Sequence, residues 1–311
     1  MNNIKRSFMY HYVRSYSKDN HFARFKDFKD FIYECKKLKK LNQFLNISDL
    51  YETCKYDKND KLFLTFDDGL KEHLNVAEEL KRLGLKGTFY ISVKPFFTKD
   101  ILPVHKAHLI LSKIGPEALD LLYETFKNEG FDRNLDLLDK EKNIFINKYK
   151  NQIDDQNIKE FKRIINYYGN LNIRNILLNS MLEKLSIKNN IEDFYLNKKE
   201  IQYIDSLGFE IGSHSYSHTL LSRLDKLNQS SELLKSKKFL ENLLNHQINS
   251  FCYPYGGSSS YTNETINLLK LHGYKNATNV EPRDINEEDI YNAFEIPRYD
   301  CNLIHSLYEF N

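Results

Sequence analysis

The chain has 311 residues, of which 41% are hydrophobic, so it is long enough and apolar enough to form a sizeable buried core. Its 45 lysines and arginines nearly balance its 43 acidic residues. The net charge of +2 gives no reason to expect a nucleic-acid or membrane-surface partner. No segment approaches the apolar length of a membrane span.

The four cysteines have no paired spacing, which favours free thiols in a reducing compartment. They are Cys35, Cys54, Cys252 and Cys301. The amino terminus carries basic residues but no apolar run of the length that a signal peptide needs. We therefore expect a cytoplasmic protein.

The first predicted strand runs from Phe8 to Val13, through aromatic and β-branched residues. His11 lies in its middle or at its end. A single histidine in an aromatic strand is more often a hydrogen-bonded core residue than a catalytic one. From Phe25 to Leu38, apolar residues recur at helical spacing opposite a lysine-rich face, which predicts a scaffold helix.

The most informative stretch begins as an apolar strand at Lys61 and ends on Asp67, Asp68 and Gly69. Adjacent residues at a strand end point to opposite sides, so the two carboxylates can take different tasks, one holding a cation and the other moving a proton. The glycine allows a sharp turn into a helix, which helical spacing predicts as far as Gly84. Taken alone, such a turn is more often a simple helix cap.

The next predicted strand covers Lys86 to Ser92, and the alternation of strand, helix and strand predicts parallel pairing. The spacing of the apolar residues then changes between residue 95 and residue 195. Apolar residues there mostly recur at three and four positions, as in Leu119, Leu122 and Tyr123. We therefore expect a helical insertion in this region.

The segment from Phe209 to His218 reads as a short apolar strand that runs into a polar turn, with His214 and His218 four residues apart. Imidazole is the commonest metal-binding side chain, and one carboxylate with two histidines leaves coordination positions open, as in catalytic metal sites. A lone pair of this spacing would more often be surface histidines. Its combination with the Asp-Asp-Gly turn favours a metal centre.

The rest of the second half alternates predicted helices and strands. Helices are expected at 197–206, 226–244 and 262–271, and strands at 248–253 and 294–300. The strand that ends at Tyr253 leads into Pro254-Tyr255-Gly256-Gly257.

With these motifs, the chain resembles the polysaccharide deacetylase family, also called the NodB-homology domain or carbohydrate esterase family 4. The segments similar to its first, second and third motifs are Thr65 to Gly69, His214 to His218 and Phe251 to Gly256. Met9-Tyr10-His11-Tyr12-Val13 resembles an opening found in one branch of the family. The resemblance covers about residues 4–94 and 196–302.

The family's fold implies an α/β architecture, a distorted (β/α)7 barrel of the NodB-homology type with a helical insertion. Residues 1–94 and 196–311 would form the two parts of the deacetylase barrel, and residues 95–195 the insertion. The motifs fall at strand ends, where such barrels place their chemistry.

The resemblance also implies the reaction, a metal-dependent removal of an acetyl group from a sugar, with N-acetyl favoured over O-acetyl. One divalent ion, zinc with cobalt or nickel as alternatives, would be held by Asp68, His214 and His218. Asp67 would be the general base, and the backbone N–H of Tyr255 would help to stabilise the oxyanion.

Two departures from the family pattern need an account. Cys252 stands where the third motif has an arginine that orients the base. Arg298 could replace that arginine from a neighbouring strand, or could instead form a structural salt bridge with Asp300.

The histidine that the family uses late in the chain as general acid is also poorly matched. The context of His305 fits that motif badly, so we predict that His11 is the acid, with His105 and His305 as alternatives. The expected partner is an acetylated sugar, a nucleotide-sugar or a glycan precursor inside the cell.

Fold and metal site do not fix the acyl donor, so a non-sugar amidohydrolase that cleaves linear or cyclic C–N bonds stays an alternative. An inactive binding protein is disfavoured, because it needs neither an open metal position nor a second carboxylate. We also expect the insertion to cover the barrel mouth and select the substrate, since loops at that end of a barrel build the site.

Overall fold

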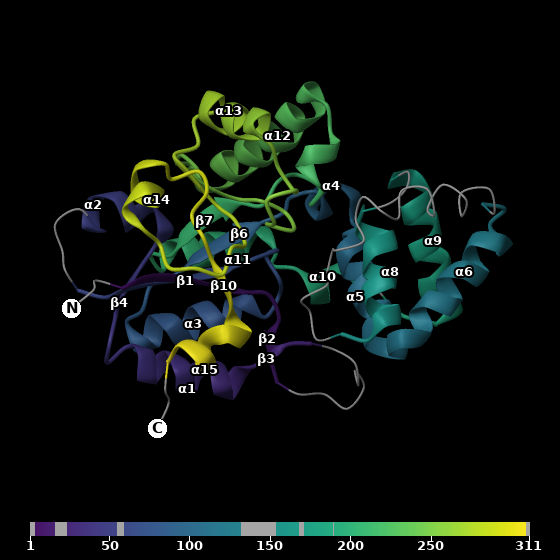
Figure 1. Ribbon diagram of the computed structural model, residues 1–311, viewed down its shortest axis with the longest axis horizontal. Helices are drawn as coiled ribbons and strands as arrows, with labels where there is room; N and C mark the ends of the chain where they lie inside the picture. The colour runs from purple at the N-terminus through teal and green to yellow at the C-terminus, as the bar shows by residue number, and fades with distance from the viewer. Residues whose placement is uncertain are drawn as a thin grey trace. The chain divides into compact units, whose positions relative to one another are not determined.

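The computed structural model describes residues 4–15, 24–54, 59–131, 154–167, 171–188 and 190–308. The chain forms two compact units (Figure 1). Unit 1 contains the described parts of 1–15, 25–98 and 192–311, and unit 2 contains Arg24 and the described part of 99–191.

Unit 1 is built on eight parallel strands, whose order is β10-β1-β5-β6-β7-β8-β9, with β4 paired to β5. They are β1 (Lys5–Tyr10), β4 (Gln43–Leu45), β5 (Lys61–Phe66), β6 (Thr88–Ile91), β7 (Glu210–Ser213), β8 (Ser250–Cys252), β9 (Asn276–Thr278) and β10 (Tyr299–Asp300). A separate parallel pair joins β2 (Val13–Arg14) to β3 (Lys26–Asp27).

The sheet curls back on itself through the segment that leads into β10. Ile296 donates its N–H to Ala277 at 3.0 Å and accepts the N–H of Asn279 at 2.9 Å, so this segment lies beside β9. Three residues later β10 pairs with β1, with Tyr299 opposite Phe8. The (β/α)7 barrel predicted from the sequence is confirmed.

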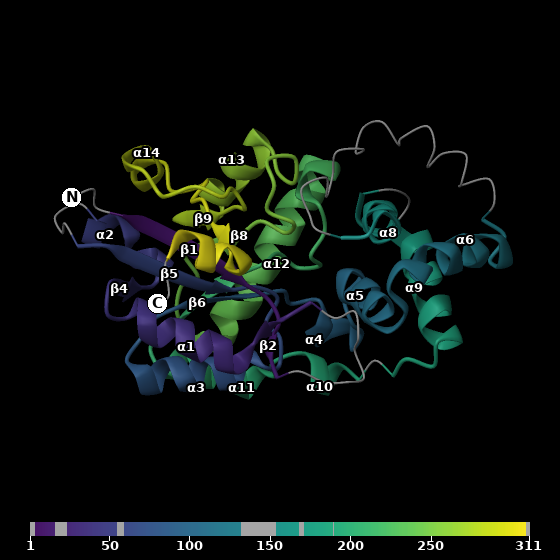
Figure 2. The ribbon, with the colours of Figure 1, turned by 60° about the horizontal axis from the view of Figure 1, so that its bottom comes forward.

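Helices follow most strands and pack on the outside of the sheet, with α3 beside α11, α11 beside α12 and α12 beside α13 (Figures 1 and 2). Those of unit 1 are α1 (Phe28–Leu38), α2 (Leu50–Cys54), α3 (His73–Leu83), α4 (Pro95–Thr98), α11 (Lys198–Ser206), α12 (Lys226–Leu244), α13 (Asn263–Leu271), α14 (Glu287–Tyr291) and α15 (Ile304–Leu307), and α10 (Ile191–Phe194) begins at its boundary. The ends follow local chemistry: Asp225 caps α12, Thr262 caps α13, and α3 stops at Gly84, whose φ is 67°.

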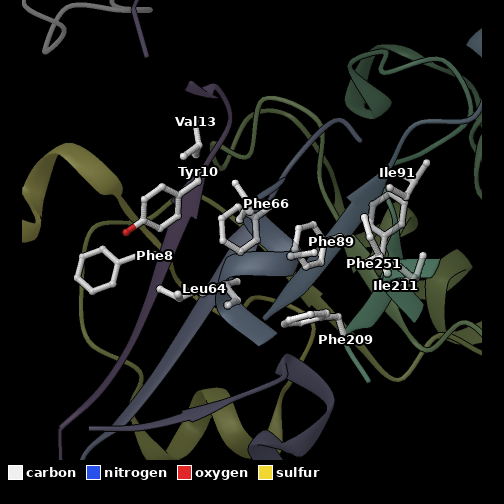
Figure 3. Close-up of a cluster of buried hydrophobic side chains, with 14 of the residues drawn as sticks. Phe8, Tyr10, Val13, Leu64, Phe66, Phe89, Ile91, Phe209, Ile211 and Phe251 are labelled. Atoms are coloured by element: carbon white, nitrogen blue, oxygen red, sulfur yellow. The ribbon is translucent and has the colours of Figure 1, made fainter. Parts of the chain in front are cut away.

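The apolar side chains of the strands point outward, toward the helices. Phe8, Phe66, Phe89, Ile211 and Phe251 belong to one buried cluster (Figure 3). The same cluster includes buried residues of α1, α3, α11, α12 and α13. This layer between sheet and helices is the core of unit 1.

The alternate residues of the strands face the barrel interior, and many of them are polar. Glu210 illustrates this, because its carboxylate accepts hydrogen bonds from the hydroxyls of Thr88 and Ser250, on the two neighbouring strands. In the same interior, Arg298 Nη1 donates to the hydroxyl of Thr65 at 2.9 Å. The barrel is thus apolar outside its sheet and hydrogen-bonded within.

Unit 2 is helical in its described part. Its helices are α5 (Pro103–Ile114), α6 (Ala118–Asn128), α8 (Gln156–Tyr167) and α9 (Leu171–Lys184). They share a buried cluster of their own, which includes Ile110, Leu122, Phe161 and Met181. These four helices therefore have a core of their own.

Some details differ from the sequence predictions. The first strand ends at Tyr10, so His11 lies in the bend after the strand rather than within it. The short strands β4 and β9 were not predicted. Among the described helices, none has the length and apolar character to cross a membrane.

Candidate active site

The first motif forms a turn that sends its two carboxylates to different partners. Strand β5 ends at Phe66, and the next residues, Asp67 and Asp68, are both buried. Asp68 and Gly69 have φ of 81° and 68°, so two successive residues are left-handed. For a non-glycine residue such as Asp68 this conformation is strained, as is common where function fixes the backbone.

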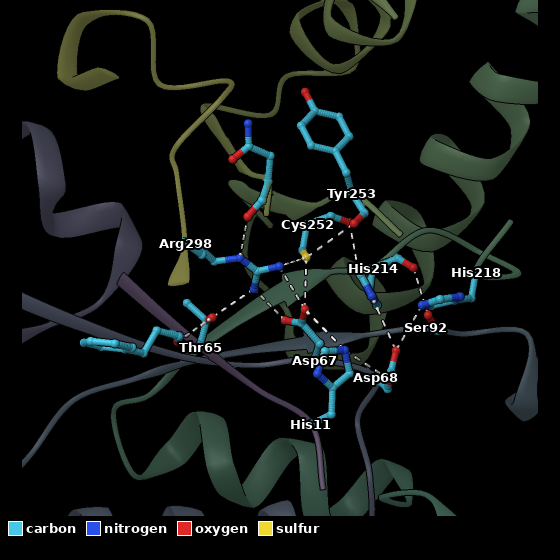
Figure 4. Close-up of polar contacts among 12 residues, drawn as sticks. His11, Thr65, Asp67, Asp68, Ser92, His214, His218, Cys252, Tyr253 and Arg298 are labelled. Carbon is cyan, nitrogen blue, oxygen red and sulfur yellow. Dashed lines mark hydrogen bonds and ion pairs between the residues drawn. The ribbon is translucent and has the colours of Figure 1, made fainter. Parts of the chain in front are cut away.

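Asp68 faces the two histidines of the second motif (Figure 4). Its Oδ1 lies 3.4 Å from His214 Nε2 and 3.3 Å from His218 Nε2, and all three side chains are buried. His214 Nδ1 donates to the carbonyl of Cys252 at 2.8 Å, which leaves Nε2 as the nitrogen with a free lone pair. Ser92 Oγ donates to the carbonyl of His214 at 2.8 Å and fixes that backbone.

The histidine turn is itself strained into place. Ser215 and His218 have φ of 61° and 55°, and the N–H of His218 donates to Ser215 Oγ at 3.0 Å. Ser217 is held by Glu232 of α12, through N–H···O and O–H···O bonds of 2.8 and 2.7 Å. These contacts bring two imidazoles to one carboxylate from residues only four apart in sequence.

The spacing of this donor set fits a divalent ion. Two ligands at about 2.0–2.1 Å from a tetrahedral zinc are about 3.3–3.4 Å apart. The separations from Asp68 to the two histidines have that size. One carboxylate oxygen with two imidazole nitrogens suits zinc, cobalt or nickel, and it leaves positions for other ligands.

A second group of ligand-type atoms, from Asp67, His214 and Cys252, also lies within 4.8 Å. The Arg298 guanidinium already binds two members of this group, with Nη2 at 2.9 Å from Asp67 Oδ2 and 3.0 Å from Cys252 Sγ. A cation there would face a buried positive charge. The set with Asp68 is therefore the better metal site.

Arg298 supplies the guanidinium that the third motif lacks at Cys252. Its side chain is fully buried and binds Asp67 in two parallel bonds, Nη1 to Oδ1 at 2.8 Å and Nη2 to Oδ2 at 2.9 Å. The hydroxyl of Thr65 and the carbonyl of Asn279 accept its other bonds, each at 2.9 Å. Of the two alternatives raised by the sequence, contact with Asp67 is the one present.

This pairing sets the charge of Asp67. Burial by itself would raise the pKa of the carboxyl group, but the positive charge of Arg298, the neighbouring His214 and the two hydrogen bonds from Arg298 lower it to about 2. Asp67 is therefore ionised at neutral pH, and its two oxygens are fixed in orientation.

His11 lies at the same site, on the other side of the carboxylates from Arg298 (Figure 4). Its Nε2 is 4.0 Å from Asp67 Oδ2 and 4.0 Å from Asp68 Oδ2. The side chain is 35% exposed, whereas Asp67 and Asp68 are 2% and 3% exposed, so His11 can meet a substrate from solvent.

The two alternative histidines have other surroundings. His305 Nε2 lies 2.8 Å from Glu34 Oε1 of α1, and its side chain is 61% exposed. His105 is buried in α5 of unit 2, with its ring 5.9 Å from that of His108. Of the three candidates, the described contacts place His11 with the motif carboxylates.

Tyr255 belongs to the loop after β8 and has a φ of 65°. Its ring lies 5.0 Å from the ring of His218, so the third motif reaches the metal-binding turn. Gly256 follows with a φ of 63°, and a Cβ there would come within 2.3 Å of Val280 Cγ2. Glycine is required at this close approach.

Comparisons with known proteins follow the same motifs. The sequence profile described as "Polysaccharide deacetylase" matches residues 181–277, which contain the second and third motifs. The Bacillus subtilis (strain 168) protein named "Putative polysaccharide deacetylase YxkH" is 30% identical over 88 residues, 28% of this chain and 30% of that protein. The chain thus matches less than a third of that relative's length.

Solved structures share the fold over nearly the whole chain. The Streptococcus pyogenes deacetylase PplD in complex with acetate has a TM-score of 0.58 at 14% identity, covering 96% of this chain and 92% of that one. IcaB from Ammonifex degensii has a TM-score of 0.56 at 12% identity, covering 98% and 95%. The profile match to the second and third motifs and the shared fold both agree with the resemblance to polysaccharide deacetylases that the sequence motifs indicate.

Proposed function

We propose that the chain is a metal-dependent deacetylase that removes an acetyl group, N-acetyl in preference to O-acetyl, from a sugar or glycan precursor. The observation that carries this proposal is that the two adjacent carboxylates of one turn have different partners. Asp68 faces two imidazoles, while Asp67 is held by Arg298 and faces His11. Metal-dependent hydrolysis can use both a cation site and an ionised carboxylate beside it as base.

Asp68, His214 and His218 would hold the divalent ion, with zinc favoured over cobalt or nickel because of the donor set. Such an ion would supply Lewis acidity toward an acyl oxygen and a water. Asp67 would accept the proton of the attacking water, since its pKa keeps it ionised at neutral pH.

His11 and Tyr255 would complete the reaction. An amide nitrogen leaves poorly unless it is protonated, and His11 is the partly exposed group that can give it a proton. The backbone N–H of Tyr255, in a loop fixed by its left-handed turn, would stabilise the charge on the acyl oxygen. Arg298 would keep Asp67 oriented throughout.

Release of acetate tests the function. Acetylated amino sugars, free and nucleotide-linked, would be incubated with metal-loaded protein beside O-acetylated sugars and cyclic and linear ureides. We expect acetate from the N-acetyl substrates, less from the O-acetyl substrates, and no ammonia from the ureides. Ammonia without acetate would replace the proposal with the non-sugar amidohydrolase.

The metal assignment has its own test, in elemental analysis of purified variants. We expect about one divalent ion per chain in the parent and in His246→Ala, a matched control because His246 is a surface histidine paired with Asp205. His214→Ala should lose most of the ion, because it removes one of three ligands. Equal metal content in His214→Ala and the control would refute the assignment.

The proposed substrate class depends on where the protein works. We propose the cytoplasm, because the cysteines have no paired spacing. Inside the cell the enzyme would meet nucleotide-sugars or glycan precursors rather than finished polymers. Two solved structures with the same fold are of deacetylases, and one of them holds acetate, which agrees with a deacetylase site but concerns those proteins.

A further inference from the structure

A second histidine, His73, contacts the backbone of the candidate acid His11. His73 is the first residue of α3, five positions after Asp68, and it is fully buried. Its Nε2 lies 2.8 Å from the backbone oxygen of His11. A carbonyl oxygen can only accept a hydrogen bond. His73 therefore carries its proton on Nε2 and donates a hydrogen bond to the His11 carbonyl.

The His11 carbonyl needs this donor because the chain leaves its strand there. The carbonyl of Tyr10 still accepts from the N–H of Asp67, at 2.9 Å. The carbonyl of Tyr12 accepts from the N–H of Lys26, at 2.8 Å. His11 lies between these two backbone bonds, in the bend after β1, and the His73 side chain holds its peptide.

Packing alone does not account for a histidine at this position. The His73 ring packs beside the stacked rings of Phe66 and Phe89, at centroid separations of 5.7 and 6.0 Å, where an apolar side chain would also fit. Burial lowers the pKa of the imidazole, so the ring is neutral. Its Nδ1 has no hydrogen-bond partner in the described part of the chain, a cost that an apolar residue would avoid.

We propose that His73 is a positioning residue for His11, a role that rests on the proposed function of His11 as acid. Its bond orients the peptide that follows the His11 Cα and so sets where the His11 imidazole points. Because His73 begins the helix that follows the Asp67-Asp68 turn, one rigid connection fixes both the carboxylates and the acid.

Two substitutions of similar size separate donation from packing. His73→Gln keeps an N–H donor that can reach the His11 carbonyl, and His73→Met fills the space without a donor. We expect His73→Met to lower kcat by about 10- to 100-fold, the range seen when a group that orients a functional side chain is lost. KM and metal content should stay near the parent values, and His73→Gln should recover most of kcat.

Tyr274→Phe is the control for lost stability, because the Tyr274 hydroxyl also donates from a buried side chain to a backbone carbonyl, that of Leu233, at 3.1 Å. It should lower the melting temperature without the loss of kcat. The proposal is wrong if His73→Gln and His73→Met have equal kcat, or if Tyr274→Phe loses as much kcat as His73→Met.

Crystal structures of the two variants give a readout that does not depend on activity. The 4.0 Å separation of His11 Nε2 and Asp67 Oδ2 should persist in His73→Gln and be lost in His73→Met. If no acetylated sugar is a substrate, the proposed function fails while this comparison still decides the positioning role. An unmoved His11 in His73→Met would overturn it.

Discussion

The guanidinium beside Asp67 comes from Arg298, and residue 252, where the third motif has an arginine, is a cysteine. A cysteine on β8 leaves room for a guanidinium that arrives from the segment before β10, and Arg298 Nη2 lies 3.0 Å from Cys252 Sγ. The bidentate contact with Asp67 has the geometry that arginine favours with carboxylates. Asp67 thus has a guanidinium partner although residue 252 is a cysteine.

Asp67 makes a prediction about stability and pH. Its pKa is about 2 in the folded chain and about 3.9 in an unfolded one, so its pairing stabilises the fold above pH ~4 and ceases to do so as pH falls toward 2. Asp67→Asn cannot lose a charge in that interval. Urea unfolding of metal-free parent and Asp67→Asn should therefore show a stability difference that shrinks by about 2 kcal/mol from pH 4 to pH 2.

A matched comparison is available in Asp225→Asn, which changes an exposed helix cap instead of the buried pair. Its stability difference from the parent should vary less over the same pH interval, since exposed charges interact weakly. A difference for Asp67→Asn that is constant from pH 4 to pH 2 would mean that Arg298 does not lower the pKa of Asp67.

His11 carries the prediction for catalysis. His11→Asn should lower turnover by about 100-fold or more, since a positioned acid contributes that much, while metal content and melting temperature stay near those of the parent. His305→Asn is the control, because that histidine pairs with Glu34 instead. A core role for His11 would show the reverse pattern, with reduced stability and preserved turnover in the folded fraction.

At this scale the sequence was most informative where a motif is contiguous. Asp67, Asp68, His214 and His218 could be named because each motif is continuous in the chain. Arg298 could be raised only as one of two alternatives, because its contact with Asp67 joins residues 231 positions apart. His73 has no motif around it, and its contact with His11 follows from how the chain bends after β1.

Among the elements, strand β9 was not predicted because its sequence lacks the pattern of a buried strand. Strand β9, Asn276–Thr278, has one small apolar residue between two polar ones. These two polar residues are buried, so the strand lacks the apolar pattern that normally marks a buried one. Helices α3, α11 and α12 were predicted to within three residues, because each has an end marked by local capping chemistry.

The loop between β8 and α13 makes a prediction about backbone strain. Gly256 and Gly208 both have positive φ, 63° and 89°, but a Cβ would meet Val280 only at Gly256. Alanine at either position carries the left-handed cost of roughly 1–2 kcal/mol. Gly256→Ala adds a clash, so its melting temperature should be lower than that of Gly208→Ala.

The same substitution should also reach the site. The carbonyl of Gly256 accepts the N–H of Val280 at 2.8 Å, so moving this residue also moves Tyr255. We expect Gly256→Ala to lower kcat and Gly208→Ala to leave it unchanged. Equal melting temperatures and equal kcat in the two variants would show that the close approach to Val280 has no consequence.

For the whole molecule, the chain combines a barrel with a helical unit that has a separate core. Residue 98 is the last of one part of unit 1 and residue 192 the first of the next, so unit 2 is inserted within the barrel. It departs soon after β6, the strand that follows the Asp67-Asp68 turn in sequence. Each unit has a buried cluster of its own, as expected of separately packed units.

The last prediction is that unit 2 covers the mouth of the barrel and selects the substrate. Connections that leave the carboxyl ends of barrel strands build the site in such folds, and this one leaves after β6. Loading the site with paramagnetic Co²⁺ should therefore broaden amide signals of α5 and α9 relative to the Zn²⁺ form, and an acetylated sugar should shift the same signals. An oligomerisation role would instead leave those signals unaffected by either metal or sugar and make them depend on protein concentration. Broadening confined to unit 1 would place unit 2 away from His214 and end the selection hypothesis.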